Sequence, residues 1–307
     1  MDWREAKVKL EALSFGYFQE DRDLIEKFRT GTSEISEAAR KELGRRGKML
    51  DLILVFAGPY APATWEQARR ELIALDIEGD ARAFLTISLI KILINGHFRD
   101  VWPQIRTQLA EVGEIAFETL AEFTRQRADS TPETPIWKQE DLVQLLMALI
   151  SFGDKAQPLL ETLSRHRSWN VRKAVAKGIG DSIDVANAEI LLGYLRSDSD
   201  WQVQAAAAEA LGRLHPARRT LGPILVERVK SERDAFVLRA ILRAIGRIGY
   251  LGAIPHLMNA IDVPNFETAS VAMEALYDLT GERLTTSTQW KRWYRETYPS
   301  WIKSQSP

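Results

Sequence analysis

The chain has 307 residues, of which 45% are hydrophobic and 27% are charged, and its net charge is −1 at pH 7. This composition is typical of a folded soluble protein, and the near-zero charge favours no class of partner. Cysteine is absent, which excludes disulfides and thiolate metal sites. The longest apolar runs fall short of the roughly 20 residues of a membrane helix, and the charged first residues contain no secretory segment. We therefore expect a cytoplasmic protein without a membrane partner.

Helical patterns fill the first 130 residues. Helices are predicted over residues 2–14, 19–29, 33–57, 65–75, 81–94, 98–110 and 113–127. We interpret residues 1–130 as an amino-terminal helical region of degenerate repeats, whose register with later repeats stays open. The segment Asp129 to Pro135 (DSTPETP) is predicted to be a hinge or insertion. Helical sequence then resumes over residues 137–152.

The most regular helix is predicted at Trp201 to Leu214, WQVQAAAAEALGRL. Four consecutive alanines favour a helix, and Asp200 before it is a good N-cap. Copies of this helix start at Trp169, Ala235 and Phe266, which gives spacings of 32, 34 and 31 residues. The chain therefore repeats a unit of one helical pair.

Each copy has the same pattern of small and apolar residues. The aligned apolar or small positions are Val171, Val203, Val237 and Thr268; Gly178, Ala210, Ala244 and Ala275; and Ile179, Leu211, Ile245 and Leu276. Gly180, Gly212 and Gly246 are predicted to close the first three copies, Gly212 as a left-handed C-terminal residue, and the fourth copy is predicted to run on to Gly281. Pro158, Pro223 and Pro255 are predicted in the first turns of the partner helices.

A single helical pair of this size cannot bury its apolar face, whereas stacked neighbours bury it continuously. Residues 137–281 are therefore predicted to form regular repeats of an all-α fold. The expected architecture is a right-handed α-solenoid of stacked antiparallel helical pairs.

One copy carries a motif with a recognisable spacing, formed by Val171, Arg172, Ala174 and Gly180. At these residues the sequence resembles HEAT repeats, specifically the bacterial type named for phycobilisome-lyase HEAT-like repeats. Gln204 and Leu238 replace the arginine in the next two copies. The resemblance covers roughly residues 153–281 and implies a solenoid fold, while its members include scaffolds and lyase subunits.

Residues 282–307 differ from the repeats because aromatic side chains are concentrated there. Ser287 or Thr288 is predicted to cap a last helix, whose aromatic residues are Trp290, Trp293, Tyr294 and Tyr298. We interpret this segment as an aromatic carboxy-terminal cap on the last repeat. The alternative is a surface for a partner peptide.

No combination of residues in the sequence indicates catalysis. The four histidines, His97, His166, His215 and His256, are scattered without metal-ligand spacing. A row of glutamates at residues 111, 114, 118 and 122 is interpreted as a solvated face, because nothing marks a paired acid and base. We predict no catalytic residue, metal site or cofactor, and a protein that is more plausibly a non-enzyme.

The candidate partner-binding residues are basic and aromatic side chains of the repeats. Between Arg213 and Arg247, nine Lys or Arg residues stand against three acids. The candidates are Lys173, Lys177, Arg213, Arg239, Arg243, Arg247, Trp169 and Trp201. The basic residues are predicted to form a stripe along the inner surface, or alternatively to pair with acids of neighbouring repeats. The tryptophans are predicted to bind a partner, or alternatively to pack between layers.

These observations favour a non-enzymatic scaffold that binds a protein partner, plausibly an acidic one, on its concave face. A second hypothesis is nucleic-acid binding or base excision, because bacterial alkylpurine DNA glycosylases also use HEAT-like repeats with a basic inner face. A third is a chromophore-lyase or chaperone subunit, which the name of the resembled repeat type implies.

Overall fold

The computed structural model describes residues 102–130 and 140–305, together with residues 27, 32–39, 41, 86, 89, 90 and 93. Most helices predicted before residue 98 lie outside the described residues, although residues 33–39 are helical as predicted. The chain divides into two compact units, Met1–Gln126 and Arg127–Pro307. Within the described residues every regular element is a helix, and there is no strand.

Two helices are described around the end of the first unit. Helix α6 (Trp102–Val112) and helix α7 (Glu114–Ser130) match the helices predicted over residues 98–110 and 113–127. Gly113 between them has a φ of 87°, a conformation that favours glycine. Because α7 continues to Ser130, the first two residues of the predicted hinge are helical. The rest of that hinge lies outside the described residues.

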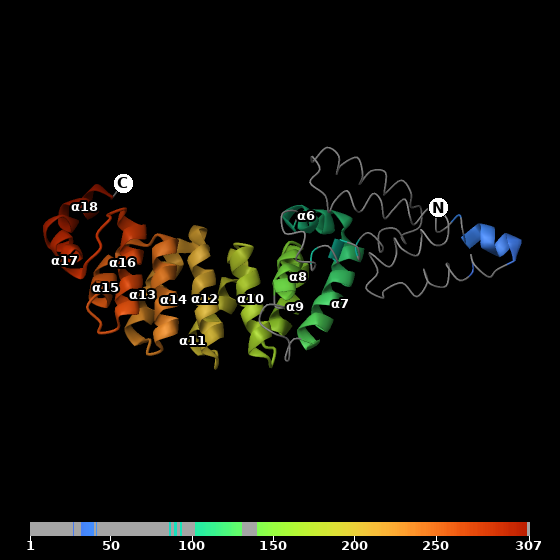
Figure 1. Ribbon diagram of the computed structural model, residues 1–307, viewed down its shortest axis with the longest axis horizontal. Helices are drawn as coiled ribbons and strands as arrows, with labels where there is room; N and C mark the ends of the chain where they lie inside the picture. Colours follow the sequence, from blue (N-terminus) through green and yellow to red (C-terminus); the bar gives the residue numbers. More distant parts are fainter. Residues whose placement is uncertain are drawn as a thin grey trace. The chain divides into compact units, whose positions relative to one another are not determined.

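The second unit contains the predicted repeats as alternating helices (Figure 1). Their bounds are α8 (Glu140–Ile150), α9 (Gln157–Ser164), α10 (Trp169–Asp181), α11 (Ala188–Ser197), α12 (Trp201–Arg213), α13 (Arg218–Ser231), α14 (Ala235–Ile248), α15 (Ile254–Ala260), α16 (Phe266–Thr280), α17 (Ser287–Glu296) and α18 (Tyr298–Ser304). Short 3-10 turns precede four of these helices, at Gly153–Ala156, Val185–Asn187, His215–Ala217 and Leu251–Ala253.

The even-numbered helices from α8 to α16 form one layer, because each contacts the next even-numbered helix. We call this the inner layer. The helices α9, α11, α13 and α15 form a second layer, and each packs on the inner helix that follows it. The fold is therefore an all-α solenoid of stacked helical pairs, as predicted, and Figure 1 shows the inner helices side by side.

The repeat alignment correctly identifies the core. All twelve aligned positions are buried, among them Val203, Ala210 and Leu211 of α12. Ala206 is buried as well, and the second layer contributes leucines such as Leu160, Leu192 and Leu225. The apolar face of each helix therefore packs against its neighbours, which supplies most of the stability of such an array.

The prediction that Gly180, Gly212 and Gly246 end their helices is wrong, whereas Gly281 ends α16 as predicted. Gly180, Gly212 and Gly246 lie inside α10, α12 and α14. A Cβ on Gly212 would stand 2.7 Å from Cα of Ala244, and one on Gly180 would stand 2.6 Å from Cβ of Ala210. The glycines are therefore needed for the close approach of consecutive inner helices. Left-handed C-terminal residues occur instead at Gly249 and Gly281.

Ser168, Asp200, Asp234 and Asn265 stand immediately before the four aligned helices, and three of them make the hydrogen bonds expected of N-cap residues. Oδ1 of Asp200 accepts from the Gln202 amide at 2.8 Å, Asp234 caps α14 and Asn265 caps α16. Ser168 makes no side-chain cap bond. These N-cap side chains stabilise the first turns of the inner helices.

The proline prediction is correct for two of three residues. Pro158 and Pro255 lie in the first turns of α9 and α15. Pro223 lies inside α13, because that helix already begins at Arg218. An extra turn of helix therefore precedes Pro223, which the apolar pattern of the partner helix does not reveal.

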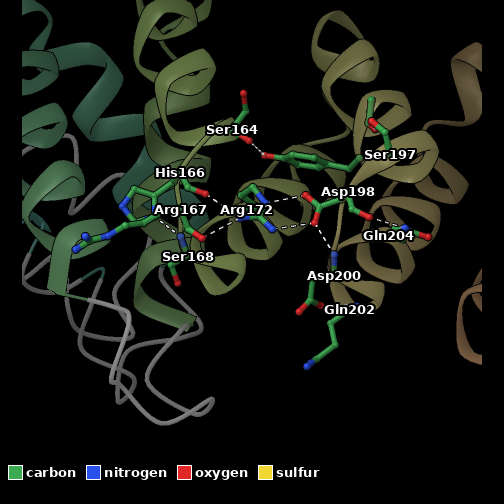
Figure 2. Close-up of polar contacts among 12 residues, drawn as sticks. Ser164, His166, Arg167, Ser168, Arg172, Ser197, Asp198, Asp200, Gln202 and Gln204 are labelled. Carbon is green, nitrogen blue, oxygen red and sulfur yellow. Dashed lines mark hydrogen bonds and ion pairs between the residues drawn. The ribbon is translucent and has the colours of Figure 1, made fainter.

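A polar cluster joins the repeats at the loops between the two layers (Figure 2). Nε and Nη2 of Arg172 bind the two carboxylate oxygens of Asp198 at 2.7 and 2.8 Å. Nη1 of Arg172 donates to the His166 carbonyl at 2.8 Å, and Asp198 also accepts from the Asp200 amide. Nearby, the Tyr194 hydroxyl donates to the carbonyl of Ser164 at 2.9 Å. These bonds fix the position of α12 relative to α10.

The carboxy-terminal segment forms two short helices instead of one. Thr286 caps α17 through a capping box with Gln289, so the predicted caps Ser287 and Thr288 are wrong. The helix ends at Glu296, and α18 begins at Tyr298 because Pro299 favours a helix first turn. Trp290 is fully buried and its Nε1 donates to the Leu284 carbonyl. Helix α17 contacts both α15 and α18, and the role of this segment as a cap stays a prediction.

Candidate partner-binding surface

Helices α10, α12, α14 and α16 each carry one row of side chains, at intervals of three or four residues, that lies outside the apolar core. We call these four rows the inner-layer surface. They consist of Lys173, Lys177 and Asp181 on α10; Gln202, Ala205, Glu209 and Arg213 on α12; Phe236, Arg239, Arg243 and Arg247 on α14; and Glu267, Ser270, Glu274 and Asp278 on α16. All six predicted basic residues lie in these rows.

Two of the six basic residues are neutralised by acids of neighbouring repeats. Nη1 of Arg213 binds Oδ1 of Asp181 at 2.5 Å, which joins α12 to α10. Nη1 of Arg239 binds Oε2 of Glu267 at 2.9 Å, and Arg239 is only 8% exposed. For Arg213 and Arg239 the structure therefore shows the alternative considered above, pairing between repeats.

The remaining four basic residues have no ion pair within the described part of the chain. Arg243 and Lys177 are half-buried, and Arg247 is exposed. Nζ of Lys173 donates to Oε1 of Gln202 at 3.1 Å and lies 5.3 Å from the centroid of the Trp169 ring. Burial, aided by the charge of Lys177, lowers the pKa of Lys173. These cations are the part of the inner-layer surface that is available to an anionic partner.

The basic stripe does not continue along the whole inner layer, contrary to the prediction. On α12 its aligned positions are Ala205, Glu209 and Arg213, of which only the last is basic, and on α16 they are Ser270, Glu274 and Asp278. Two carboxylates of α16 therefore occupy the positions aligned with Arg243 and Arg247, and a third, Glu267, pairs with Arg239. The sequence prediction did not include the acids of α16, although the repeat alignment locates them by the same spacing as the arginines of α14.

Aromatic side chains lie along one edge of this surface, at the first turns of the inner helices. Trp201 is 44% exposed, Phe236 55% and Phe266 80%, while Trp169 is half-buried. The rings of Trp201 and Phe236 lie 4.8 Å apart between centroids, and the guanidinium of Arg239 lies 4.7 Å from the Phe236 ring. Sequence alignment missed Phe236 because the residue aligned with Trp201 is Ala235.

The histidine and glutamate side chains considered in the sequence analysis do not form a site among the described residues. His166 lies near Asp129, with 3.6 Å between Nε2 and Oδ1. The glutamates at 111, 114, 118 and 122 are all exposed. Among the residues that the structure describes, no three His, Asp or Glu side chains are grouped so that they could hold a metal ion. None of the described helices is long and apolar enough to cross a membrane.

Comparison with known proteins identifies the repeats. A family model described as HEAT repeats matches residues 139–212 and residues 188–277. The two matches overlap and together extend from the start of α8 into α16. No curated protein matches the chain. Residues 139–277 are therefore HEAT repeats, while their assignment to the phycobilisome-lyase type stays a prediction.

Proposed function

We propose that this HEAT-repeat protein is a non-enzymatic scaffold and that its inner-layer surface binds an acidic segment of a protein partner. The observation that carries the proposal is that Arg243, Arg247 and Lys177 have no ion pair among the described residues and lie on the same layer of helices as the exposed rings of Trp201 and Phe236. Aromatic and arginine side chains supply most of the binding energy at protein interfaces. HEAT repeats also commonly mediate protein interactions.

The distribution of charge favours a protein over a nucleic acid. A nucleic acid presents a uniform row of phosphates, and each phosphate contact requires a cation. Here Glu267, Glu274 and Asp278 of α16 lie beside the arginines of α14, and Glu209 lies on α12. Like charges placed together across an interface cost affinity. A polypeptide can place its carboxylates against α14 and leave α16 uncontacted or opposite basic residues.

Charge reversal on the inner layer tests the proposal. The tagged double variant Arg243→Glu/Arg247→Glu is expected to lose capture of the partner from a lysate of the native host, whereas the wild-type protein captures it. Capture by the wild type is expected to weaken as salt rises, because salt screens exposed charges. The matched control is the double variant Arg218→Glu/Arg219→Glu, which reverses the same number of charges at exposed positions of α13 in the other layer.

Two results would contradict the proposal. Equal capture by the inner-layer variant and the wild type would reject this surface. Captured material that a nuclease removes would instead support the nucleic-acid hypothesis. Thermal unfolding of each variant, measured by circular dichroism, separates lost binding from lost folding.

A further inference from the structure

The rings of Trp201 and Phe236 form an apolar ledge that is held in place before any partner binds. The two rings belong to adjacent inner helices and contact each other at a centroid distance of 4.8 Å. The guanidinium of Arg239 lies 4.7 Å from the centroid of the Phe236 ring and is itself held by Glu267. Little side-chain entropy is left to lose on binding, so an apolar group can dock here at low cost.

Along the inner-layer row of α14, the first guanidinium after the ledge that has no ion pair among the described residues belongs to Arg243. It follows Phe236 by seven residues on α14, so the two side chains share one face of the helix. A rise of 1.5 Å per residue separates them by about 10 Å along the helix. Arg239 between them is already neutralised by Glu267. A carboxylate that approaches from the ledge therefore meets Arg243 as its first available partner.

From this geometry we propose, building on the function proposed above, that the partner contributes an extended acidic segment with one apolar anchor residue. The anchor packs on the Trp201–Phe236 ledge, and a carboxylate three positions away in the segment binds Arg243. An extended chain of the polyproline II type advances about 3.1 Å per residue and returns to the same face every third residue, so three residues bring the carboxylate across the separation of about 10 Å to Arg243.

An extended segment differs from a helical one in the spacing of its two contact residues. A helix rises about 1.5 Å per residue, so it would need seven residues to reach from the ledge to Arg243, whereas an extended segment needs three.

Neighbouring acids fix where the carboxylate of the segment can lie. Glu209 on α12 and Glu274 on α16 occupy the positions aligned with Arg243 on either side of it. A carboxylate displaced toward either helix meets a like charge, which costs affinity. The segment is therefore expected to place its acidic residue over α14.

A displayed library of random nonapeptides, selected on the full-length protein, tests the inference. The enriched peptides are expected to carry an aromatic or aliphatic residue three positions from Asp or Glu. A synthetic peptide of that consensus is expected to bind about tenfold more weakly to Phe236→Ala and to Arg243→Ala, as for central interface residues. Only the second variant should reduce the salt dependence of binding. The control Arg219→Ala is expected to bind the peptide as the wild type does.

The outcomes separate this inference from the proposed function. Enrichment of acidic peptides without an anchor at that spacing, or binding unaffected by Phe236→Ala, overturns the inference and leaves the acidic-partner proposal intact. A seven-residue spacing overturns the extended conformation. Enrichment of peptides without acidic residues, together with host capture unaffected by Arg243→Glu/Arg247→Glu, overturns both proposals. Unchanged thermal unfolding of each variant excludes misfolding as the cause.

Discussion

Arg172 of α10 and Asp198, 26 residues later, form an ion pair with two hydrogen bonds that joins consecutive repeats. Both side chains are largely buried, and the hydrogen bond to Asp198 raises the pKa of Arg172. The arginine of the repeat motif therefore acts between repeats as well as within one. It fixes the loop before α12 and hence the position of the first turn that carries Trp201.

Later repeats keep parts of this arrangement with other residues. Gln204 takes the place of Arg172, and its Nε2 still donates to the carbonyl six residues before it, that of Asp198, at 2.6 Å. In the following repeat Leu238 can make neither bond. There Arg228 donates from Nε to the Leu195 carbonyl and pairs with Glu232, the counterpart of Asp198. The motif residue is lost while a link between repeats remains.

Replacing Arg172 with glutamine is expected to lower the free energy of unfolding by roughly 1.5–3 kcal/mol, the usual range for hydrogen bonds to charged groups. Glutamine can keep the bond to the His166 carbonyl, as Gln204 does at its own position, but it leaves the buried Asp198 carboxylate without its cation. Urea unfolding followed by circular dichroism measures the change. Arg196→Gln, at an exposed position of α11, serves as the control.

A double-mutant cycle with Asp198→Asn isolates the pair itself. If the two substitutions destabilise the protein additively, the ion pair does not link the repeats and this reading of the cluster is wrong.

Two Gly→Ala substitutions should change stability in opposite directions. Alanine in a helix is ordinarily more favourable than glycine by roughly 0.5–1 kcal/mol. At Gly193 of α11 an added Cβ meets nothing within 4 Å, so Gly193→Ala should raise the melting temperature. At Gly212 the same methyl group would stand 2.7 Å from the Ala244 backbone, so overpacking should outweigh the helix preference by about 1–3 kcal/mol. Stabilisation by both substitutions would show that the inner helices do not require this close approach.

These glycines illustrate which features the sequence can predict. Buried positions such as Val203 and Leu211 recur with the helical period, and burial of an apolar side chain leaves a local pattern. The role of Gly212 depends instead on Ala244 in the next repeat, and a glycine near a helix end looks like a C-cap in the sequence. The role of Gly212 therefore becomes visible only in the packing of α12 against α14.

The candidate surface was predictable to a similar degree. The period of the repeats places Arg239 and Arg243 in one row, as predicted. It does not show that Arg239 is buried and paired with an acid while Arg243 has no ion pair among the described residues. Glu267 pairs with Arg239, although the repeat alignment matches Glu267 with Phe236, three residues before Arg239. The alignment alone therefore does not identify this ion pair. The ledge escaped prediction because Phe236 reaches the Trp201 ring from a position one residue later.

The Tyr194 hydroxyl should make stability depend on alkaline pH. Burial raises the pKa of Tyr194 well above its ordinary value of about 10. Above pH 10 the unfolded chain therefore releases this proton while the folded chain retains it. The stabilisation from the neutral hydroxyl is thus complete below pH 10 and is lost as pH rises toward the folded-state pKa.

Tyr194→Phe should accordingly be less stable than the wild type by about 1 kcal/mol at pH 7, because it lacks the bond to the Ser164 carbonyl. This difference should shrink as pH rises above 10 in urea unfolding experiments. A difference that is constant from pH 7 to pH 11 would mean that Tyr194 ionises equally in both states.

Arg239 and Arg243 lie four residues apart on α14, and their charge reversals are expected to have separable effects. Arg239 is 8% exposed, pairs with Glu267 and lies over the Phe236 ring, so a glutamate there would bury a carboxylate beside another one. Glu267 is largely exposed, so most of the cost of Arg239→Glu comes from the buried carboxylate that the substitution creates, and the variant should have a markedly lower melting temperature. Arg243 has no ion pair within the described residues, and Arg243→Glu should change stability by no more than about 0.5 kcal/mol.

Thermal unfolding of the two single variants checks this difference, and the charge swap Arg239→Glu/Glu267→Arg should recover part of the lost stability because it restores an attractive pair. Loss of partner binding in the Arg239 variant would then report a disturbed ledge, whereas loss in the Arg243 variant would report a missing contact with the partner. If the two variants melt at the same temperature, Arg239 is not held by Glu267 in solution. The ledge would then lose the support that orients Phe236, and an apolar anchor would have to order the ring as it binds.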